Sequence, residues 1–275
     1  MHLGHGVAVT SVPTEVFVGG KALTPARWPN AGYAPQDGLV DAGSAPRNTE
    51  ADIPVAERSH EAPRGGTFRV HDLQRLARWQ RSPEPWAGGF WNWDWSDELL
   101  PIAKIDPVEG TVTLAMPHRY GIAARGRYYV TNILAELDAP GEFWIDVQHG
   151  RIHAWLPDGA AQQPVEVSML QAPILTIEGG SQVRLRNLAF RTTRGNAVVL
   201  RLADDAEVRG CRFARIGVQA VEAEGHSVVI AQSEFEGIGG TGVILTSGER
   251  RTLTPSGSRI EDCTFRDCEI GRAHV

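Results

Sequence analysis

The chain has 275 residues, of which 42% are hydrophobic, so it is long enough for one large domain or for two ordinary domains with cores of their own. Its formal net charge of -6 argues against a nucleic-acid partner or general affinity for anionic membranes. A continuous run of 18 apolar residues is absent, which argues against a membrane-spanning helix.

Residues 1–166 are expected to form a non-repeating, β-rich module. Residues 35–66 are rich in Pro, Gly, Ala and charge, which is typical of a long surface loop. Residues 72–79 place Leu73 and Leu76 at helical spacing and predict one short helix. Alternating apolar residues predict strands at 15–18, 111–115, 128–133, 142–147 and 151–156.

Three tryptophans alternate in a short segment of this module. Trp91, Trp93 and Trp95 would lie on one face of an extended chain. Flat indoles on one face can stack on sugar rings, so they are candidate substrate-binding residues. The alternative is a packed apolar interface, which needs the same large side chains.

The stretch Gly141–Pro157 is expected to form a hairpin. Two alternating runs flank a Gln-His-Gly turn. The indoles of Trp144 and Trp155 are expected to be buried.

One spaced pattern occurs four times in the last third of the chain. Its first copy is Val183-x-Leu185-x-x-Leu188-x-Phe190, and the equivalent phenylalanines of the other copies follow at intervals of 23, 22 and 30 residues. The long interval is explained by a loop inserted at residues 247–255. A fixed period near 22 with period-two alternation predicts a parallel β-helix with three short strands in each coil, over residues 167–269. The phenylalanines expected to form an inward ladder are Phe190, Phe213, Phe235 and Phe265.

The three cysteines are interpreted as free thiols. Cys211 and Cys263 fall in one ladder with Leu188 and Ser233, two coils apart, which puts their Cα atoms about 9.6 Å from each other and beyond disulfide reach. Spacing typical of a zinc site is also missing, so we predict no metal site. Glu261, Asp262 and Asp267 form only a thin cluster of the acids that calcium needs, so we expect no cofactor and keep calcium as an alternative without support.

The last six residues, 270–275, read IGRAHV and resemble the translation of a sequencing adapter. We therefore expect the natural protein to continue past Glu269, and a β-helix that stopped there would leave an uncapped sheet edge. Met1 would then be an internal methionine. The residues after Met1 do not show the charged segment and subsequent apolar segment of a secretion signal.

Three stretches together resemble a family of large secreted bacterial proteins. They are ARWPN at residues 26–30, GFWNWDWSD at residues 89–97 and LAELDAPGEFWID at residues 134–146. They are similar to the region before the main coils in right-handed parallel β-helix proteins, many of which are glycoside hydrolases or polysaccharide lyases. The resemblance implies an all-β fold, a polysaccharide or oligosaccharide partner, and an extracellular or periplasmic location.

Outward-facing acids on the coils are the candidates for glycoside hydrolysis, which needs two nearby carboxyl groups, one of them protonated. Glu234 and Glu236 share one face at i, i+2. The repeat places Arg212 beside the first and Arg266 beside the second, however, which is also the pattern of a solvated ion-pair ladder.

A second candidate pair lies on a turn of the coils. Asp204 and His226 occupy the same register on adjacent coils, so the carboxylate could orient the imidazole as a base. A stacked turn pair without chemistry is the alternative.

The inserted loop supplies the last candidates. Arg250 and Arg251 could neutralise an acidic sugar, as a polysaccharide lyase requires, or could simply be solvated. A glycoside hydrolase with its decisive residues beyond Glu269 is the function that we expect. A polysaccharide lyase and a non-catalytic carbohydrate-binding or adhesive solenoid are the alternatives.

Overall fold

The computed structural model describes residues 14–50, 53–249 and 251–269. The chain divides into two compact units. Unit 1 combines the segment that ends at Ala22 with the chain from Pro164 onward, and unit 2 is the stretch Leu23–Gln163 between them. In sequence, unit 2 is therefore an insertion into unit 1.

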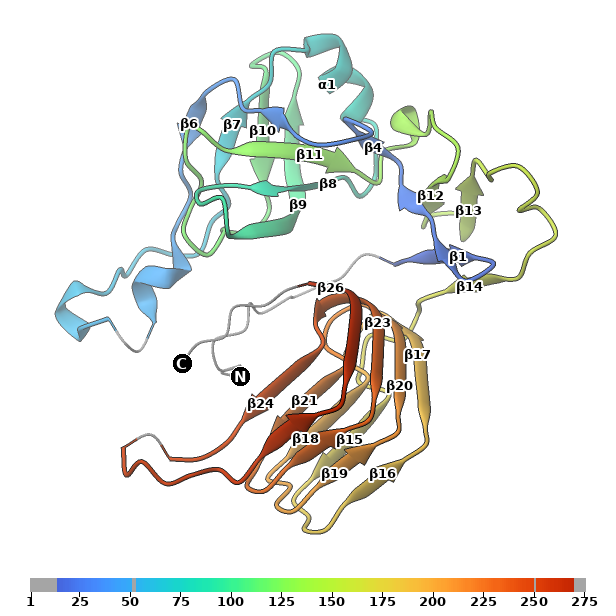
Figure 1. Ribbon diagram of the computed structural model, residues 1–275. Helices are drawn as coiled ribbons and strands as arrows, with labels where there is room; N and C mark the ends of the chain where they lie inside the picture. Colours follow the sequence, from blue (N-terminus) through green and yellow to red (C-terminus); the bar gives the residue numbers. More distant parts are fainter. Residues whose placement is uncertain (1–13, 51–52, 250, 270–275) are drawn as a thin grey trace. The chain divides into compact units, whose positions relative to one another are not determined.

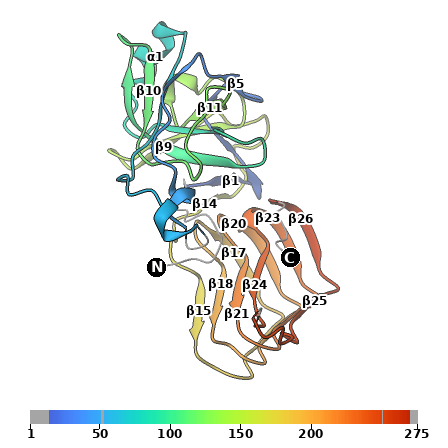
Figure 2. The ribbon, with the colours of Figure 1, turned by 90° about the vertical axis from the view of Figure 1, so that its left-hand side faces the viewer.

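Most of unit 1 is a parallel β-helix. Three parallel sheets of four strands each run through it, and successive strands of the chain go to successive sheets (Figures 1 and 2). Four stacked coils result, as the repeat predicts. The first sheet contains β15 (Leu175–Glu178), β18 (Val198–Arg201), β21 (Val221–Glu224) and β24 (Val243–Thr246); the second contains β16 (Arg184–Arg186), β19 (Glu207–Arg209), β22 (Val229–Ala231) and β25 (Arg259–Glu261); the third contains β17 (Ala189–Thr193), β20 (Arg212–Ile216), β23 (Glu234–Thr241) and β26 (Thr264–Glu269).

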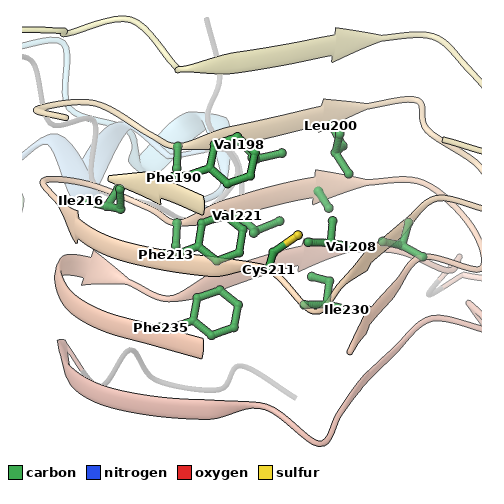
Figure 3. Packing of buried hydrophobic residues seen from close by; sticks show 14 of the residues in the cluster. Phe190, Val198, Leu200, Val208, Cys211, Phe213, Ile216, Val221, Ile230 and Phe235 are labelled. Carbon is green, nitrogen blue, oxygen red and sulfur yellow. The ribbon is translucent and has the colours of Figure 1, made fainter. Parts of the chain in front are cut away.

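A stack of phenylalanines fills the interior of the β-helix. Neighbouring rings of the ladder are 4.5–5.2 Å apart and within 8° of parallel, and Figure 3 shows three of them one above another. Phe213 and Phe235 are fully buried, which confirms the predicted ladder. At the end of the stack, Phe265 is 45% exposed because its strand, β26, is an edge of the third sheet.

The cysteine ladder is confirmed only in part. Cys211 and Ser233 are buried, and Cys263 is half-buried. Leu188, expected beside them, is exposed, because it lies between β16 and β17 in the coil at the edge of the stack. All three thiols are free.

Residues with a left-handed backbone conformation recur at two positions of each coil. A residue with positive φ follows each ladder phenylalanine by two positions: Thr192, Arg215, Gly237 and Asp267. A second set precedes each phenylalanine by three positions: Asn187, Gly210, Gln232 and Asp262. The second set lies between the strands of the second and third sheets, where the chain turns, and Asn, Asp and Gly tolerate this conformation best. The first set lies inside the strands of the third sheet.

Unit 1 also contains a small antiparallel sheet. Its central strand is β1 (Val16–Val18), which pairs with β14 (Val165–Val167) and β2 (Lys21–Ala22). Glu166 of β14 accepts hydrogen bonds from the Arg215 guanidinium at 3.1 Å and from the Thr192 hydroxyl at 3.0 Å. These bonds tie β14 to the first two coils.

Unit 2 is built on an eight-stranded antiparallel sheet. Its core contains Phe68, Trp79, Trp91 and Tyr128, which are all buried. The strands, in sheet order, are β4 (Arg27–Trp28), β11 (Arg127–Thr131), β8 (Trp86–Phe90), β9 (Asp97–Asp106), β10 (Thr111–Leu114), β7 (Thr67–Arg69) and β6 (Leu39–Asp41), with β5 (Ala34–Pro35) also paired to β11.

The single α-helix of the described residues is α1 (Leu73–Trp79), as the sequence predicts. Asp72 caps it by accepting a hydrogen bond from the Arg75 backbone N–H. The buried carboxylate of Glu136 accepts hydrogen bonds from Trp79 Nε1 and Arg75 Nη1, each at 2.8 Å. Glu136 lies in the 3-10 turn η3 (Leu134–Glu136), so this turn is fixed to the helix.

The predicted hairpin is present in a three-stranded sheet. β12 (Glu142–Asp146) pairs antiparallel with β13 (Arg151–Ala154) and parallel with β3 (Thr24–Pro25). Trp144 is buried as expected. The burial expected for Trp155 is wrong: it is 49% exposed, and it follows β13, an edge strand whose four residues are all exposed.

The segment expected to be a loop is mostly irregular. Among the described residues between 35 and 66, the regular elements are the short strand β6 and the 3-10 turns η1 (Pro46–Thr49) and η2 (Val55–Glu57). An ion pair joins Arg119 to Glu50, with both contacts at 2.7 Å.

Candidate functional site

The acids proposed for hydrolysis lie on the outer face of the third sheet. Glu234 and Glu236 of β23 are 61% and 52% exposed, and Arg212 lies 3.4 Å from the first and 4.0 Å from the second. Arg266 is in register with Glu236, so both expected pairings of charge are confirmed. Exposed carboxylates that share one arginine form a solvated ion pair, and their catalytic role stays a prediction.

The turn pair is joined through the backbone. The Asp204 carboxylate accepts a hydrogen bond from the His226 backbone N–H at 2.8 Å, and the Asp205 N–H donates to the His226 carbonyl at the same distance. This is the geometry of stacked turns. Asp204 is occupied by a main-chain donor here, and the role of His226 as a base remains untested.

The arginines of the inserted loop are only partly described, because Arg250 lies outside the described residues. Arg251 is exposed, and its backbone N–H donates to Glu249 at 2.9 Å. An antiparallel bridge between Glu249 and Thr254 closes the loop.

The three alternating tryptophans do not share one face. Trp91 is fully buried and its Nε1–H donates to the Glu98 carbonyl at 2.8 Å, whereas Trp93 and Trp95 are 50% and 46% exposed. The expectation fails because the chain leaves β8 at Phe90 and turns, so period-two alternation no longer applies. For Trp91 the packing alternative is the correct one.

Trp93 and Trp95 form a pair of nearly parallel indoles. Their ring centroids are 6.4 Å apart with an angle of 11° between the planes. Tyr120 meets Trp95 edge-on, with centroids 5.3 Å apart and an angle of 76°. We call these three side chains the aromatic platform.

A buried acid and histidine pair lies behind the aromatic platform. The His118 ring is 6.0 Å from the Tyr120 ring, and its Nε2 is 3.6 Å from Oε2 of Glu98, at the start of β9. His118 Nδ1 lies 2.8 Å from the Gly121 carbonyl, so Nδ1 carries the proton and Nε2 presents its lone pair. Nε2 is buried and has no hydrogen-bond partner.

Burial makes both groups of this pair prefer their neutral forms. Desolvation raises the pKa of Glu98 from 4.5 to about 7, although the Arg119 backbone N–H, 3.3 Å from Oε2, acts in the opposite direction. Desolvation also lowers the pKa of His118. Near pH 7 the Glu98 carboxyl is therefore only partly ionised and faces a neutral imidazole.

Sequence reasoning did not find Glu98 or His118. Each is a single titratable residue without a motif around it, and their approach depends on the connection between β10 and β11 returning to the start of β9. The GFWNWDWSD segment directly precedes Glu98, but only its tryptophans were predicted as candidates.

The described residues also bear on metal binding and on membrane insertion. Within that part of the chain, His, Cys, Asp and Glu do not gather in any group of three suited to a metal ion. The helices found there are too short or too polar to cross a membrane.

Comparison with known proteins gives a likeness in fold. Neither a protein-family model nor a curated protein matches the chain. A solved structure described as a glycoside hydrolase is similar, with a TM-score of 0.66 and 14% sequence identity. The chain shares its fold with a glycoside hydrolase. The similarity covers 93% of this chain and 54% of the hydrolase, so the chain spans about half the length of that protein.

Proposed function

We propose that the chain is part of a secreted bacterial protein that acts on polysaccharide as a glycoside hydrolase. The observation that supports this most is the likeness in fold to a glycoside hydrolase over 93% of the chain. The stretches at residues 26–30, 89–97 and 134–146, which resemble the same class of proteins, support it independently. An extracellular or periplasmic location is part of the proposal.

In this proposal the catalytic carboxyl groups lie on coils that follow Glu269 in the parent protein. A hydrolase needs one carboxyl group that is protonated and one that is ionised. Glu234 and Glu236 are both well exposed beside one arginine, which does not favour a difference between them. They remain the pair to test first, because they are adjacent and face outward.

The test begins with a read of the parent gene across the codons for Glu261 to Val275, which defines the reading frame to express. The purified protein is then incubated with a panel of polysaccharides. New reducing ends without an unsaturated product are the expected result. The single variants Glu234→Gln and Glu236→Gln show whether this pair carries the activity. If both variants remain active, the catalytic residues lie elsewhere in the protein.

Two results would contradict the proposed function. A product that absorbs as an unsaturated sugar would indicate the polysaccharide lyase alternative, in which a loop cation such as Arg251 neutralises the substrate carboxylate. Polysaccharide that is retained and never cut would indicate a carbohydrate-binding or adhesive solenoid.

A further inference from the structure

The aromatic platform of unit 2 is exposed to solvent, unlike the central stacked rings inside the β-helix. In the interior of the β-helix, stacked rings are 4.5–5.2 Å apart, and the central ones are fully buried. The planes of Trp93 and Trp95 are almost as parallel, but their centres are 6.4 Å apart and about half of each side chain faces water. Two nearly parallel indoles, each about half exposed, therefore lie at the surface of unit 2.

The backbone and a third ring hold these indoles in place. The Ser96 N–H donates to the Trp93 carbonyl at 3.1 Å, which closes the turn that carries both side chains. Tyr120 supports Trp95 from the side, and the Tyr120 carbonyl accepts a hydrogen bond from the Asn92 amide at 2.8 Å. The platform is thus ordered before any ligand binds, which lowers the entropy cost of binding.

The chemistry of the platform suits a sugar ring. The face of an indole is the negative end of its quadrupole, and the C–H groups on the face of a pyranose carry partial positive charge from the neighbouring oxygens. A pyranose is also flat enough on that side to cover an indole.

The charges around the platform select among sugars. Asp94 and Asp97, on either side of Trp95 in the sequence, are exposed. The nearby cations already have acidic partners: Arg127 pairs with Asp94 at 2.9 Å, and Arg119 pairs with Glu50. Arg127 compensates Asp94, so Asp97 leaves a small acidic excess that disfavours a polymer of uronic acids and favours uncharged sugars.

We propose that Trp93, Trp95 and Tyr120 form a binding site for an uncharged polysaccharide chain, in which sugar rings stack on the exposed surfaces of the indoles. This deepens the proposed function and rests on it for the substrate class. The site belongs to unit 2 alone and requires no residue of the coils.

Binding of the full chain to soluble polysaccharides tests the site. Affinity electrophoresis and calorimetry would use a β-glucan, a xylan and a galactomannan as uncharged polymers, and polygalacturonate as the acidic one. Tight binding to at least one uncharged polymer is expected, with weaker binding to polygalacturonate. Trp93→Ala and Trp95→Ala should each weaken binding at least about fivefold, whereas Trp93→Phe should keep most of it.

Trp155→Ala is the matched control, because Trp155 is an equally exposed indole of the same unit outside the platform. The proposal is overturned if the alanine variants at 93 and 95 bind like the unchanged protein, if Trp155→Ala weakens binding as much, or if polygalacturonate is preferred. It is also overturned if none of the uncharged polymers binds. Release of reducing ends is measured separately from binding. The proposed hydrolase function and the proposed binding site can therefore be supported or contradicted independently of each other.

Discussion

At the scale of single residues, Glu98 and His118 form a buried acid and base pair in which desolvation shifts the pKa of both groups. Its two groups respond to pH in opposite directions. Because the pKa of Glu98 is raised in the folded state, its contribution to stability is full below about pH 4.5 and is lost as pH rises toward 7. Because the pKa of His118 is lowered, its contribution is full above about 6.5 and is lost as pH falls through the folded value.

Glu98→Gln separates these two effects. Glutamine has the shape of the protonated acid and can still accept the Arg119 N–H, but it does not ionise. We expect the free energy of unfolding to rise by about 1 to 3 kcal/mol at pH 8 and to change little at pH 4.5. Urea unfolding at both pH values measures it. The exposed Glu234→Gln is the control, and equal effects of the two variants, or destabilisation by Glu98→Gln at pH 8, would contradict the assignment.

Residue identities alone could indicate only part of the site. The tryptophans of the GFWNWDWSD segment were predicted as candidates, but alternation could not distinguish Trp91, which is buried, from Trp93 and Trp95, which are exposed. That distinction arises from a turn that follows β8 directly. The approach of His118 to Glu98 spans 20 positions and is set by the path of a loop, which leaves no periodic signal.

At the scale of elements, the phenylalanine ladder should contribute unequally along its length. Phe213→Ala removes a fully buried ring between two others, and we expect it to cost about 3 to 5 kcal/mol of unfolding free energy. Phe265→Ala removes a ring that is 45% exposed at the edge, and should cost less than half as much. Urea unfolding followed by far-ultraviolet circular dichroism compares them, and equal costs would show that the edge coil is covered in solution.

The sequence was more informative about the coils than about unit 2 for a physical reason. Each coil repeats the same strands and the same left-handed positions, so four weak patterns support one another and fix the register of Phe190 on Phe213 and onward. In unit 2 each strand occurs once. Of the eight strands in its main sheet only β10 and β11 were predicted, together with α1, and the order of the strands depends on distant pairings, such as β4 with β11, that no local pattern specifies.

At the scale of the whole molecule, the chain holds two separate cores. One consists of the aliphatic and phenylalanine ladders of the coils, and the other surrounds Trp79, Trp91 and Tyr128. The second is contained in a stretch inserted between Ala22 and Pro164.

This division also separates the chromophores. All eight tryptophans and all four tyrosines of the chain fall within residues 23–163, so unit 1 absorbs in the near ultraviolet only through phenylalanine. Indole emission therefore reports on the inserted unit alone. If the units unfold independently, Phe213→Ala should shift the unfolding transition seen by circular dichroism and leave the one seen by indole emission unchanged. A common shift in both signals would show that the β-helix and the inserted unit unfold as one cooperative body.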